Sequence, residues 1–355
     1  MLLSSAGSYT LGCEITDRSI KTIQLKRSGT MPKIISIGHT RLKSGIVKDG
    51  KIEDFNALEK ALRSAISKIQ GKKLYTNDAV LSIPDSQTFV KTVTIDTAQD
   101  GDIRDKVLKE IQKHFPLDPE EAIFDWQELK RTAHHTQVIV SAVNKDIAEP
   151  YFELCKKVGW HVLALELEAE ATARALLGKN LDTNAMIIDI GYAHSSLILV
   201  ADKTIQFTLS LPISNKMIIE MISQKLKLSA EQAEKAKIKC GLDEKKCKGA
   251  LKIVLDAILD DLAFKIEDAF QYFEANTDDY TSSINTVILT GGGAHLAGIE
   301  RVLTNKLKHT VEKSNVKKFV RPINPKTFPH MANENLYSFV TPIGLALRNI
   351  HSRFL

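Results

Sequence analysis

Three consecutive glycines stand between two apolar stretches near the end of the chain. Residues 287–303, VILTGGGAHLAGIERVL, have the pattern of a strand that ends at Thr290, followed by Gly291, Gly292 and Gly293 and then a helix. Because glycine lacks a β-carbon, a flat ligand can lie directly against this backbone, and the helix N-terminus beyond it favours negative charge. The alternative is close packing of one backbone on another. The triplet therefore predicts either a nucleoside contact or a tight packing position.

Two hairpin-like segments carry residue types that suit phosphate and metal. Residues 11–25 and 186–200 each have an apolar strand, an acid, an isoleucine, a short turn and a second strand, so that Glu14 aligns with Asp189 and Thr16 with Gly191. Gly191 permits a turn whose N–H groups face one concavity, and Asp189 is placed to orient a hydrated Mg²⁺. An acid before a glycine turn is also common in ordinary turns. Together with the glycine triplet, the hairpins favour a nucleotide held between two domains.

Alternating strand-like and helix-like stretches must position these residues, and they predict an α/β fold. A strand–strand–strand–helix–strand group is followed by a small α/β insertion, and a second α/β half begins near residue 185. The predicted strands cover residues 9–15, 20–26, 32–42, 78–84, 88–95, 122–129 and 136–143, and the predicted helices cover 55–69, 103–115, 146–159, 217–228, 229–241, 253–275 and 339–350.

Composition narrows the class of protein. The chain has 355 residues, of which 43% are hydrophobic and 26% charged, as in soluble globular proteins of roughly two domains. A net charge of +5 is too small for a dedicated nucleic-acid binder. The sequence contains no run of about eighteen apolar residues, so it predicts no membrane-spanning helix. The N-terminus lacks the pattern of a signal peptide. Four scattered cysteines argue against a disulfide-built fold and favour a reducing cytoplasm, and the Cys240 to Cys247 spacing is too wide for a usual zinc pair.

The quoted motifs resemble those of the actin-like ATPase superfamily. MIIDIGYAHSSLILV is similar to its second phosphate motif, and VILTGGGAHLAGIERVL is similar to its adenosine motif. Within the superfamily, nearly the whole chain resembles the PilM family, which assembles type IV pili, through segments in the family's order such as LSIPDSQTFVKTVTI, SAEQAEKAKIKCGL and TPIGLALRNI. The resemblance implies an actin-like (ribonuclease H-like) two-domain fold with a small inserted α/β subdomain as in FtsA and PilM. The implied domains are residues 1–83 with 163–182, the insertion 84–162, and 183–355 with a helical subdomain at about 209–281.

The resemblance also implies ATP and Mg²⁺ as cofactors and a role for particular residues. Glu168 would position attacking water, although Glu166 and Glu170 flank it and any of the three suits a surface position. Asp189 and Glu14 would contact the metal. The implied cofactor-binding residues are Glu14, Ser19, Lys21, Asp189, Gly191, Ser195, Ser196, Glu234, Lys237, Gly291, Gly292 and Gly293.

Several departures from the family pattern predict weak or absent ATPase activity. Thr16 replaces a glycine in the first hairpin, Glu14 is one methylene longer than the usual aspartate, and Arg18 is new there. Pro212 and Ile213 stand where relatives carry two glycines. We expect bound nucleotide to have a structural role.

The implied partner is the N-terminal cytoplasmic peptide of a PilN-like inner-membrane protein, held between the first domain and the insertion. The chain would be a cytoplasmic subunit at the inner face of the membrane, within the pilus assembly platform, without nucleic acid, and a homodimer stays open. An FtsA-like division or filament protein and a small-molecule kinase of the same superfamily are the alternatives. Two basic stretches, residues 234–252 and 305–321, either approach anionic lipid or are solvated helix faces.

Overall fold

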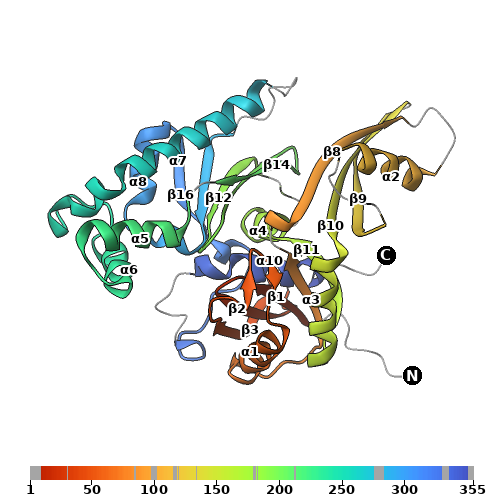
Figure 1. Cartoon of the computed structure of the whole chain (residues 1–355), viewed down its shortest axis with the longest axis horizontal. Coiled ribbons are helices and arrows are strands. Elements are labelled where there is room, and N and C mark those ends of the chain that lie inside the picture. Colours follow the sequence, from red (N-terminus) through yellow and green to blue (C-terminus); the bar gives the residue numbers. More distant parts are fainter. Residues whose placement is uncertain are drawn as a thin grey trace. The chain divides into compact units, whose positions relative to one another are not determined.

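The computed structural model divides the chain into two compact units, shown in Figure 1. Unit 1 contains residues 1–27, 34–171 and 345–355, and unit 2 contains residues 28–33 and 172–344. The structure describes residues 9–29, 31–83, 85–96, 102–114, 118, 120–132, 134–178, 181, 183–211, 213–275, 284–329 and 336–350. Pro84, Phe115 and Pro212, which the sequence analysis used, lie outside these residues. The predicted domain boundaries stay a prediction.

Unit 1 is built on a six-stranded sheet with the order β11-β7-β1-β2-β3-β6. β1 pairs antiparallel with β2 and parallel with β7, so a hairpin and a parallel pair share one strand. The core packs apolar residues of β1, β7, α1 and α3 together, and Asp54 caps α1 by accepting a 2.9 Å hydrogen bond from the Ala57 N–H. The elements are β1 (Tyr9–Ile15), β2 (Ser19–Lys26), β3 (Lys33–Arg41), β4 (Val47–Lys48), β5 (Lys51–Ile52), α1 (Phe55–Ser67), β6 (Gln70–Gly71), β7 (Asp78–Ile83), η1 (Asp85–Gln87), α3 (Lys145–Val158), β11 (His161–Leu167) and α4 (Glu168–Leu177).

A separate three-stranded antiparallel sheet with the order β8-β10-β9 follows within unit 1. It comprises β8 (Thr88–Asp96), β9 (Ala122–Arg131) and β10 (His135–Asn144), and it packs with α2 (Ile103–His114) around its own apolar cluster, which includes Val93, Val107 and Val138. Figure 1 shows β8, β9, β10 and α2 grouped together. These strands and this helix confirm the elements predicted for the insertion.

Unit 2 contains a five-stranded sheet with the order β14-β13-β12-β15-β16. The antiparallel β12–β13–β14 meander is joined to two parallel strands, β15 and β16. Apolar residues of the sheet and of four helices form a large core. The elements are β12 (Ala185–Ile190), β13 (Ser195–Ala201), β14 (Thr204–Leu211), α5 (Asn215–Leu226), α6 (Ala230–Lys239), η2 (Cys247–Gly249), α7 (Ala250–Ala275), β15 (Thr286–Thr290), η3 (Gly292–His295), α8 (Ile299–Leu307), β16 (Thr310–Lys313), η4 (Val316–Lys318), η5 (Leu336–Phe339) and α10 (Val340–Ile350).

The helices of unit 2 follow from their local sequence. Ser229 caps α6 and forms a capping box with Gln232, in which each side chain accepts from the other residue's backbone N–H. α7 buries residues at helical spacing, from Leu251 through Leu255 and Leu262 to Ile266, and directs its acids outward. None of the helices in the described part of the chain is long and apolar enough to cross a membrane.

A disulfide joins Cys240 to Cys247, and their Cα atoms are 5.9 Å apart. The scattered cysteine pattern does not predict this bond, which closes one short loop of unit 2. The two residues meet because α6 ends at Lys239 and the chain then reverses before α7. Cys13 and Cys155 are buried and free.

Candidate functional site

The second hairpin, formed by β12 and β13, ends in the residues predicted for phosphate. Asp189 is half-buried at the end of β12. In the strand register it lies opposite Ser196 of β13 and Thr290 of β15. A β-carbon on Gly191 would lie 2.3 Å from the His194 carbonyl oxygen. Glycine is therefore required here for close approach of the backbone across the turn.

The glycine triplet lies directly beside this hairpin. Gly291 has φ +78°, and a β-carbon there would lie 2.2 Å from Oδ1 of Asp189 and 2.6 Å from the Ile190 carbonyl oxygen. A β-carbon on Gly293 would lie 2.0 Å from Cγ2 of Ile190. Gly292 differs, because the nearest atom to its β-carbon position is 3.8 Å away. Two of the glycines thus serve the close packing that the sequence left as an alternative, whereas a β-carbon on Gly292 would make only an ordinary van der Waals contact with Asn215.

A polar group from α5 and α6 adjoins the same turn. The backbone N–H of Asn215 donates to the Gly191 carbonyl at 2.9 Å, and Nζ of Lys237 donates to Oδ1 of Asn215 at 2.5 Å. Lys237 also pairs with Glu234 at 2.8 Å, one helical turn away. Sequence reasoning selected Glu234 and Lys237 but missed Asn215. The available signal was Ser214, whose side chain caps α5 and thereby fixes the residue after it against the hairpin turn.

Positive charge is concentrated beside the glycine turn. Lys237 is fully buried, and this burial lowers the pKa of its ammonium group, while the hydrogen bond and charge of Glu234 oppose the shift. Burial, followed by the charges of Lys237 and Lys313, lowers the pKa of His295, which follows the triplet. The His295 ring lies 5.3 Å from the Tyr337 ring, centroid to centroid. Among the described residues, Glu234 is the one carboxylate that pairs with this ammonium group, and the hydrogen bond from Nζ of Lys237 to Asn215 holds the pair beside the glycine turn.

Ser195 provides a buried polar group without a partner. Its residue is 4% exposed, and its Oγ forms no hydrogen bond among the residues that the structure describes. An unpaired buried hydroxyl costs about 1–3 kcal/mol. A ligand oxygen at the hairpin would satisfy it, so the residues present fit a phosphate group. Ser196, its neighbour, is half-buried.

The turn of the first hairpin, formed by β1 and β2, pairs its polar groups within the protein, although farther along these strands Oγ1 of Thr10 and Thr22 and Nε2 of Gln24 are buried without a partner among the described residues. Lys21 pairs with the carboxylate of Glu14 at 2.6 Å, and the two side chains are 15% and 9% exposed. Oγ1 of Thr16 accepts from the Ser19 N–H at 3.2 Å and from the Arg18 N–H at 3.4 Å. These N–H groups are those that a glycine-containing turn would offer to an anion. The structure thus brings Glu14, Ser19 and Lys21 together, and their cofactor role stays a prediction.

Glu168 begins α4 and is half-buried, whereas Glu166, two residues earlier, is buried and pairs with Arg348 at 2.8 Å. A carboxylate that the sequence analysis missed lies at this helix start. Oδ1 of Asp85 accepts from the Ala169 N–H at 3.3 Å, and burial raises the pKa of Asp85 to about 6 although the Ala169 and Glu168 N–H groups oppose this shift. The catalytic role of Glu168 stays a prediction.

Known structures share this fold. A PilM–PilN type IV pilus biogenesis complex matches with a TM-score of 0.77 at 20% sequence identity, and the match covers 97% of this chain and 99% of that chain. Ethanolamine utilization protein EutJ from Carboxydothermus hydrogenoformans matches with a TM-score of 0.57 at 16% identity, over 96% of this chain and 89% of that chain. MreB5 of Spiroplasma citri bound to ADP matches with a TM-score of 0.50 at 13% identity, over 95% and 94% of the two chains. The protein therefore has an actin-like ATPase fold, as predicted.

A match to a protein-family model shows which family of this fold the chain belongs to. The model described as type IV pilus assembly protein PilM matches residues 12–350. The chain therefore belongs to the PilM family, and it is an actin-like type IV pilus assembly protein.

Proposed function

We propose that this PilM-family protein binds ATP with Mg²⁺ and holds the N-terminal peptide of a PilN-like membrane protein during type IV pilus assembly. The nucleotide part rests on two groups that meet beside the glycine turn of unit 2, namely the Asp189 carboxylate and the Ser195 hydroxyl, which has no partner among the described residues. The MreB5 structure named above contains ADP, which supports nucleotide binding as a property of this fold.

Each residue has a proposed role at the nucleotide site. The turn after Asp189, with Gly191, Ser195 and Ser196, would hold phosphate, and Asp189 would orient the hydrated Mg²⁺. Lys237, fixed by Asn215 and Glu234, would supply positive charge. Gly292 would lie against the nucleoside. When bound, Mg²⁺ would neutralise phosphate charge.

The first hairpin supports a structural rather than a hydrolytic role for the nucleotide. Its Glu14 and Lys21 neutralise each other, and Thr16 takes up two turn N–H groups. Any phosphate contact there must first break these interactions. We therefore propose slow or absent turnover, with Glu168 as the residue that would position water if hydrolysis occurs.

Calorimetric titration of ATP with Mg²⁺ into the whole chain tests the nucleotide site. We expect saturable binding that Asp189→Asn weakens about tenfold or more, since it removes a carboxylate that orients the metal. The matched variant Glu14→Gln should change the affinity less than about threefold, because this carboxylate already pairs with Lys21. Equal losses of affinity in the two variants would contradict the different roles proposed for the two hairpins. Absence of ATP binding would contradict the nucleotide part of the proposal.

The partner part rests on family membership and on the described insertion sheet. The matched solved structure is a PilM–PilN complex, and this chain retains the β8-β10-β9 sheet with its own core. Phe89 and Ile123 on this sheet are 36% and 38% exposed. We propose that the peptide binds where the insertion meets the first domain, and that it brings the chain to the inner face of the cytoplasmic membrane.

Fluorescence anisotropy with the labelled N-terminal peptide of the PilN-like protein from the same operon tests this partner. A scrambled peptide of the same composition is the control. We expect saturable binding of the native peptide alone, in both the presence and the absence of ATP. Equal binding of the two peptides would contradict the proposal, and so would binding that survives Phe89→Glu combined with Ile123→Glu.

A further inference from the structure

Four exposed lysines and one exposed isoleucine gather where α6 meets α7. We call this group the basic loop: Ile238, Lys239, Lys245, Lys246 and Lys248. Ile238 is 48% exposed. In the described part of the chain, none of the four lysines forms an ion pair or a side-chain hydrogen bond. The neighbouring Lys252 differs, because it pairs with Glu244.

The fold fixes the base of this loop and directs its lysines outward. The disulfide Cys240–Cys247 closes it, Leu242 is fully buried, and the Leu242 N–H donates to the Ala297 carbonyl at 2.8 Å. A β-carbon on Gly241 would lie 2.2 Å from the same carbonyl oxygen, so the loop sits directly on the chain after η3. Lys248 has φ +55°, a left-handed conformation that turns the chain back toward α7. The base of the loop is therefore fixed by the fold, and its lysine side chains are exposed to solvent.

The kind of charge favours a lipid surface over a protein or a nucleic acid. Every cation of the basic loop is lysine, and residues 239–249 contain neither arginine nor an aromatic residue. Protein interfaces are enriched in arginine and aromatic residues and depleted in lysine. Nucleic-acid sites use lysine for phosphate contacts, but sites that read bases or hold single strands add arginine or stacking aromatic residues, which are absent here. Lysine is a flexible point charge that suits a fluid layer of anionic headgroups, and its aliphatic stem, like Ile238, fits the headgroup–acyl boundary.

A second copy of the chain is the main competing occupant. Phe264 on α7 is 64% exposed, and Asp261 and Asp268 lie three residues before it and four residues after it on the same helix. Neither aspartate forms an ion pair among the described residues. This acidic face complements the basic loop in charge. Nothing in the structure shows that this acidic face and the basic loop match in shape, whereas binding to anionic lipid does not require matched shapes.

We propose that the basic loop is a docking site for anionic phospholipid headgroups. It would hold unit 2 against a negatively charged membrane surface, and it involves neither the nucleotide site nor the PilN-like peptide. Each lysine near such a surface strengthens binding about fivefold, so three lysines contribute on the order of a hundredfold. The attraction is screened by salt, so binding should fall steeply between low and physiological ionic strength.

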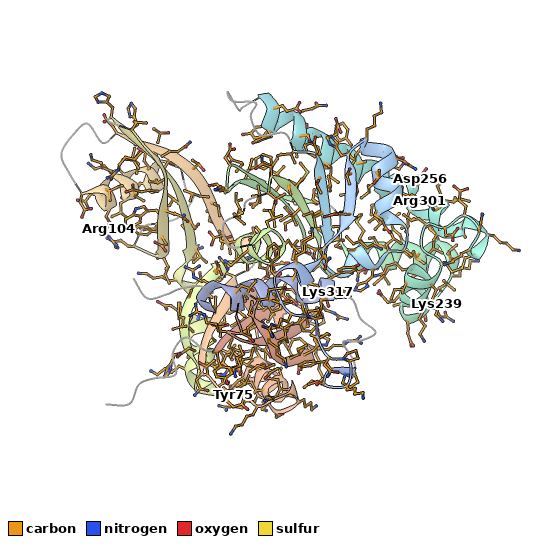
Figure 2. All side chains as sticks on the ribbon, turned by 180° about the vertical axis from the view of Figure 1, so that it is seen from behind. Tyr75, Arg104, Lys239, Asp256, Arg301 and Lys317 are labelled. Carbon is orange, nitrogen blue, oxygen red and sulfur yellow. A yellow bond between two sulfur atoms is a disulfide. The ribbon has the colours of Figure 1, made fainter. Side chains whose placement is uncertain are left out.

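Co-sedimentation of the full chain with vesicles tests this, using phosphatidylcholine with and without phosphatidylglycerol. We expect binding only to the anionic vesicles, and a loss of more than about a hundredfold in Lys239→Glu combined with Lys246→Glu and Lys248→Glu, because each substitution reverses a charge rather than removing it. The matched control reverses three other exposed lysines of unit 2, Lys317→Glu, Lys318→Glu and Lys326→Glu, and so changes net charge equally. Figure 2 shows Lys239 at the outer end of α6, apart from Lys317. The control should lose no more than about fivefold.

Four outcomes would overturn the proposal. The first two are a wild type that does not bind anionic vesicles, and equal losses of binding in the two triple variants. The third is binding to a short DNA duplex that the basic-loop triple variant weakens to the same extent. The fourth is self-association, detected by sedimentation velocity, that is abolished both by the basic-loop triple variant and by Asp261→Lys combined with Asp268→Lys. The last would assign the loop to a second copy. Circular dichroism and thermal unfolding of both triples check that the variants fold.

Discussion

The two β-hairpins of this PilM-family protein have the same order of strands and opposite chemistry at their turns. In unit 1, Glu14 and Lys21 neutralise each other and Thr16 accepts from two turn N–H groups. In unit 2, glycine replaces threonine at Gly191, and Ser195 keeps a buried hydroxyl without a partner among the described residues. At the turn itself, the first hairpin pairs its polar groups, while the second leaves the Ser195 hydroxyl without a partner among the described residues and so available to a ligand.

The difference shows that backbone topology alone does not make a binding site. Both turns join an apolar strand carrying an acid to a second strand, and both sheets place that strand beside a parallel neighbour. Hydrogen-bond capacity left over after folding is what a ligand can use, because a group paired within the protein must lose that partner before it binds another.

Gly291→Ala should lower the free energy of unfolding by about 2–4 kcal/mol, because its β-carbon would meet Asp189 and Ile190 and its φ is left-handed. Gly292→Ala is the matched control and should change it by less than about 0.5 kcal/mol, since its β-carbon would make only an ordinary contact with Asn215, at 3.8 Å. Urea unfolding followed by circular dichroism measures both. Equal costs would mean that the triplet does not pack as described.

Lys21→Met should lower the free energy of unfolding by about 2 kcal/mol, because it leaves the carboxylate of Glu14 buried without its partner. Combining it with Glu14→Gln should restore at least half of that loss, since the charge is then removed as well. A double-mutant cycle in urea gives the coupling energy. Simple additivity of the two changes would show that the first hairpin is not held by this pair.

Lys237→Met should cost about 1–2 kcal/mol, because Asn215 loses a buried donor beside the second hairpin. Lys235→Met on the same helix is the control. Lys235 is exposed and pairs only with Glu231, so its loss should stay below about 0.5 kcal/mol. The measurement is the thermal unfolding of each variant without nucleotide, and an equal shift in both would refute a buried polar group in this position.

Ser195→Ala and Thr16→Ala should change stability in opposite directions. Without nucleotide, Ser195→Ala removes an unsatisfied hydroxyl and should stabilise the fold by up to about 1 kcal/mol. Thr16→Ala removes the acceptor for the Arg18 and Ser19 N–H groups and should destabilise it by about 0.5–1 kcal/mol. Differential scanning calorimetry compares them. A loss of stability in Ser195→Ala would mean that its hydroxyl already has a partner.

Much of the fold is predictable from local pattern. The strands containing Glu14 and Asp189, the long helix α7 and the insertion elements follow from apolar periodicity, and their observed bounds differ from the predicted ones by a few residues. The short strands β4, β5 and β6 have only two residues each and are not predictable from their own sequence. β6 forms because the distant strand β3 supplies its hydrogen bonds, whereas β4 and β5 pair with each other across a tight turn.

The candidate site was less predictable than the fold. Asn215 carries no motif, and only the packing of α5 against the β12–β13 turn gives it a role. Asp85 likewise gains significance from the start of α4, 84 residues away in sequence. The disulfide Cys240–Cys247 depends on the reversal of the chain after α6. Each of these contacts joins residues whose proximity is set by other parts of the chain.

Apolar periodicity and turn residues act over a few neighbouring positions, so the α/β class, the two related hairpins and the likeness to actin-like ATPases are all predictable from the amino-acid sequence. Which polar groups pair within the protein depends on the folded arrangement. Folding pairs Glu14 with Lys21, buries Lys237 against Asn215, and packs Gly291 and Gly293 tightly while Gly292 keeps an ordinary contact distance. The physical reason is that burial and hydrogen-bond satisfaction depend on every element that surrounds a group, and no local stretch of sequence contains that information.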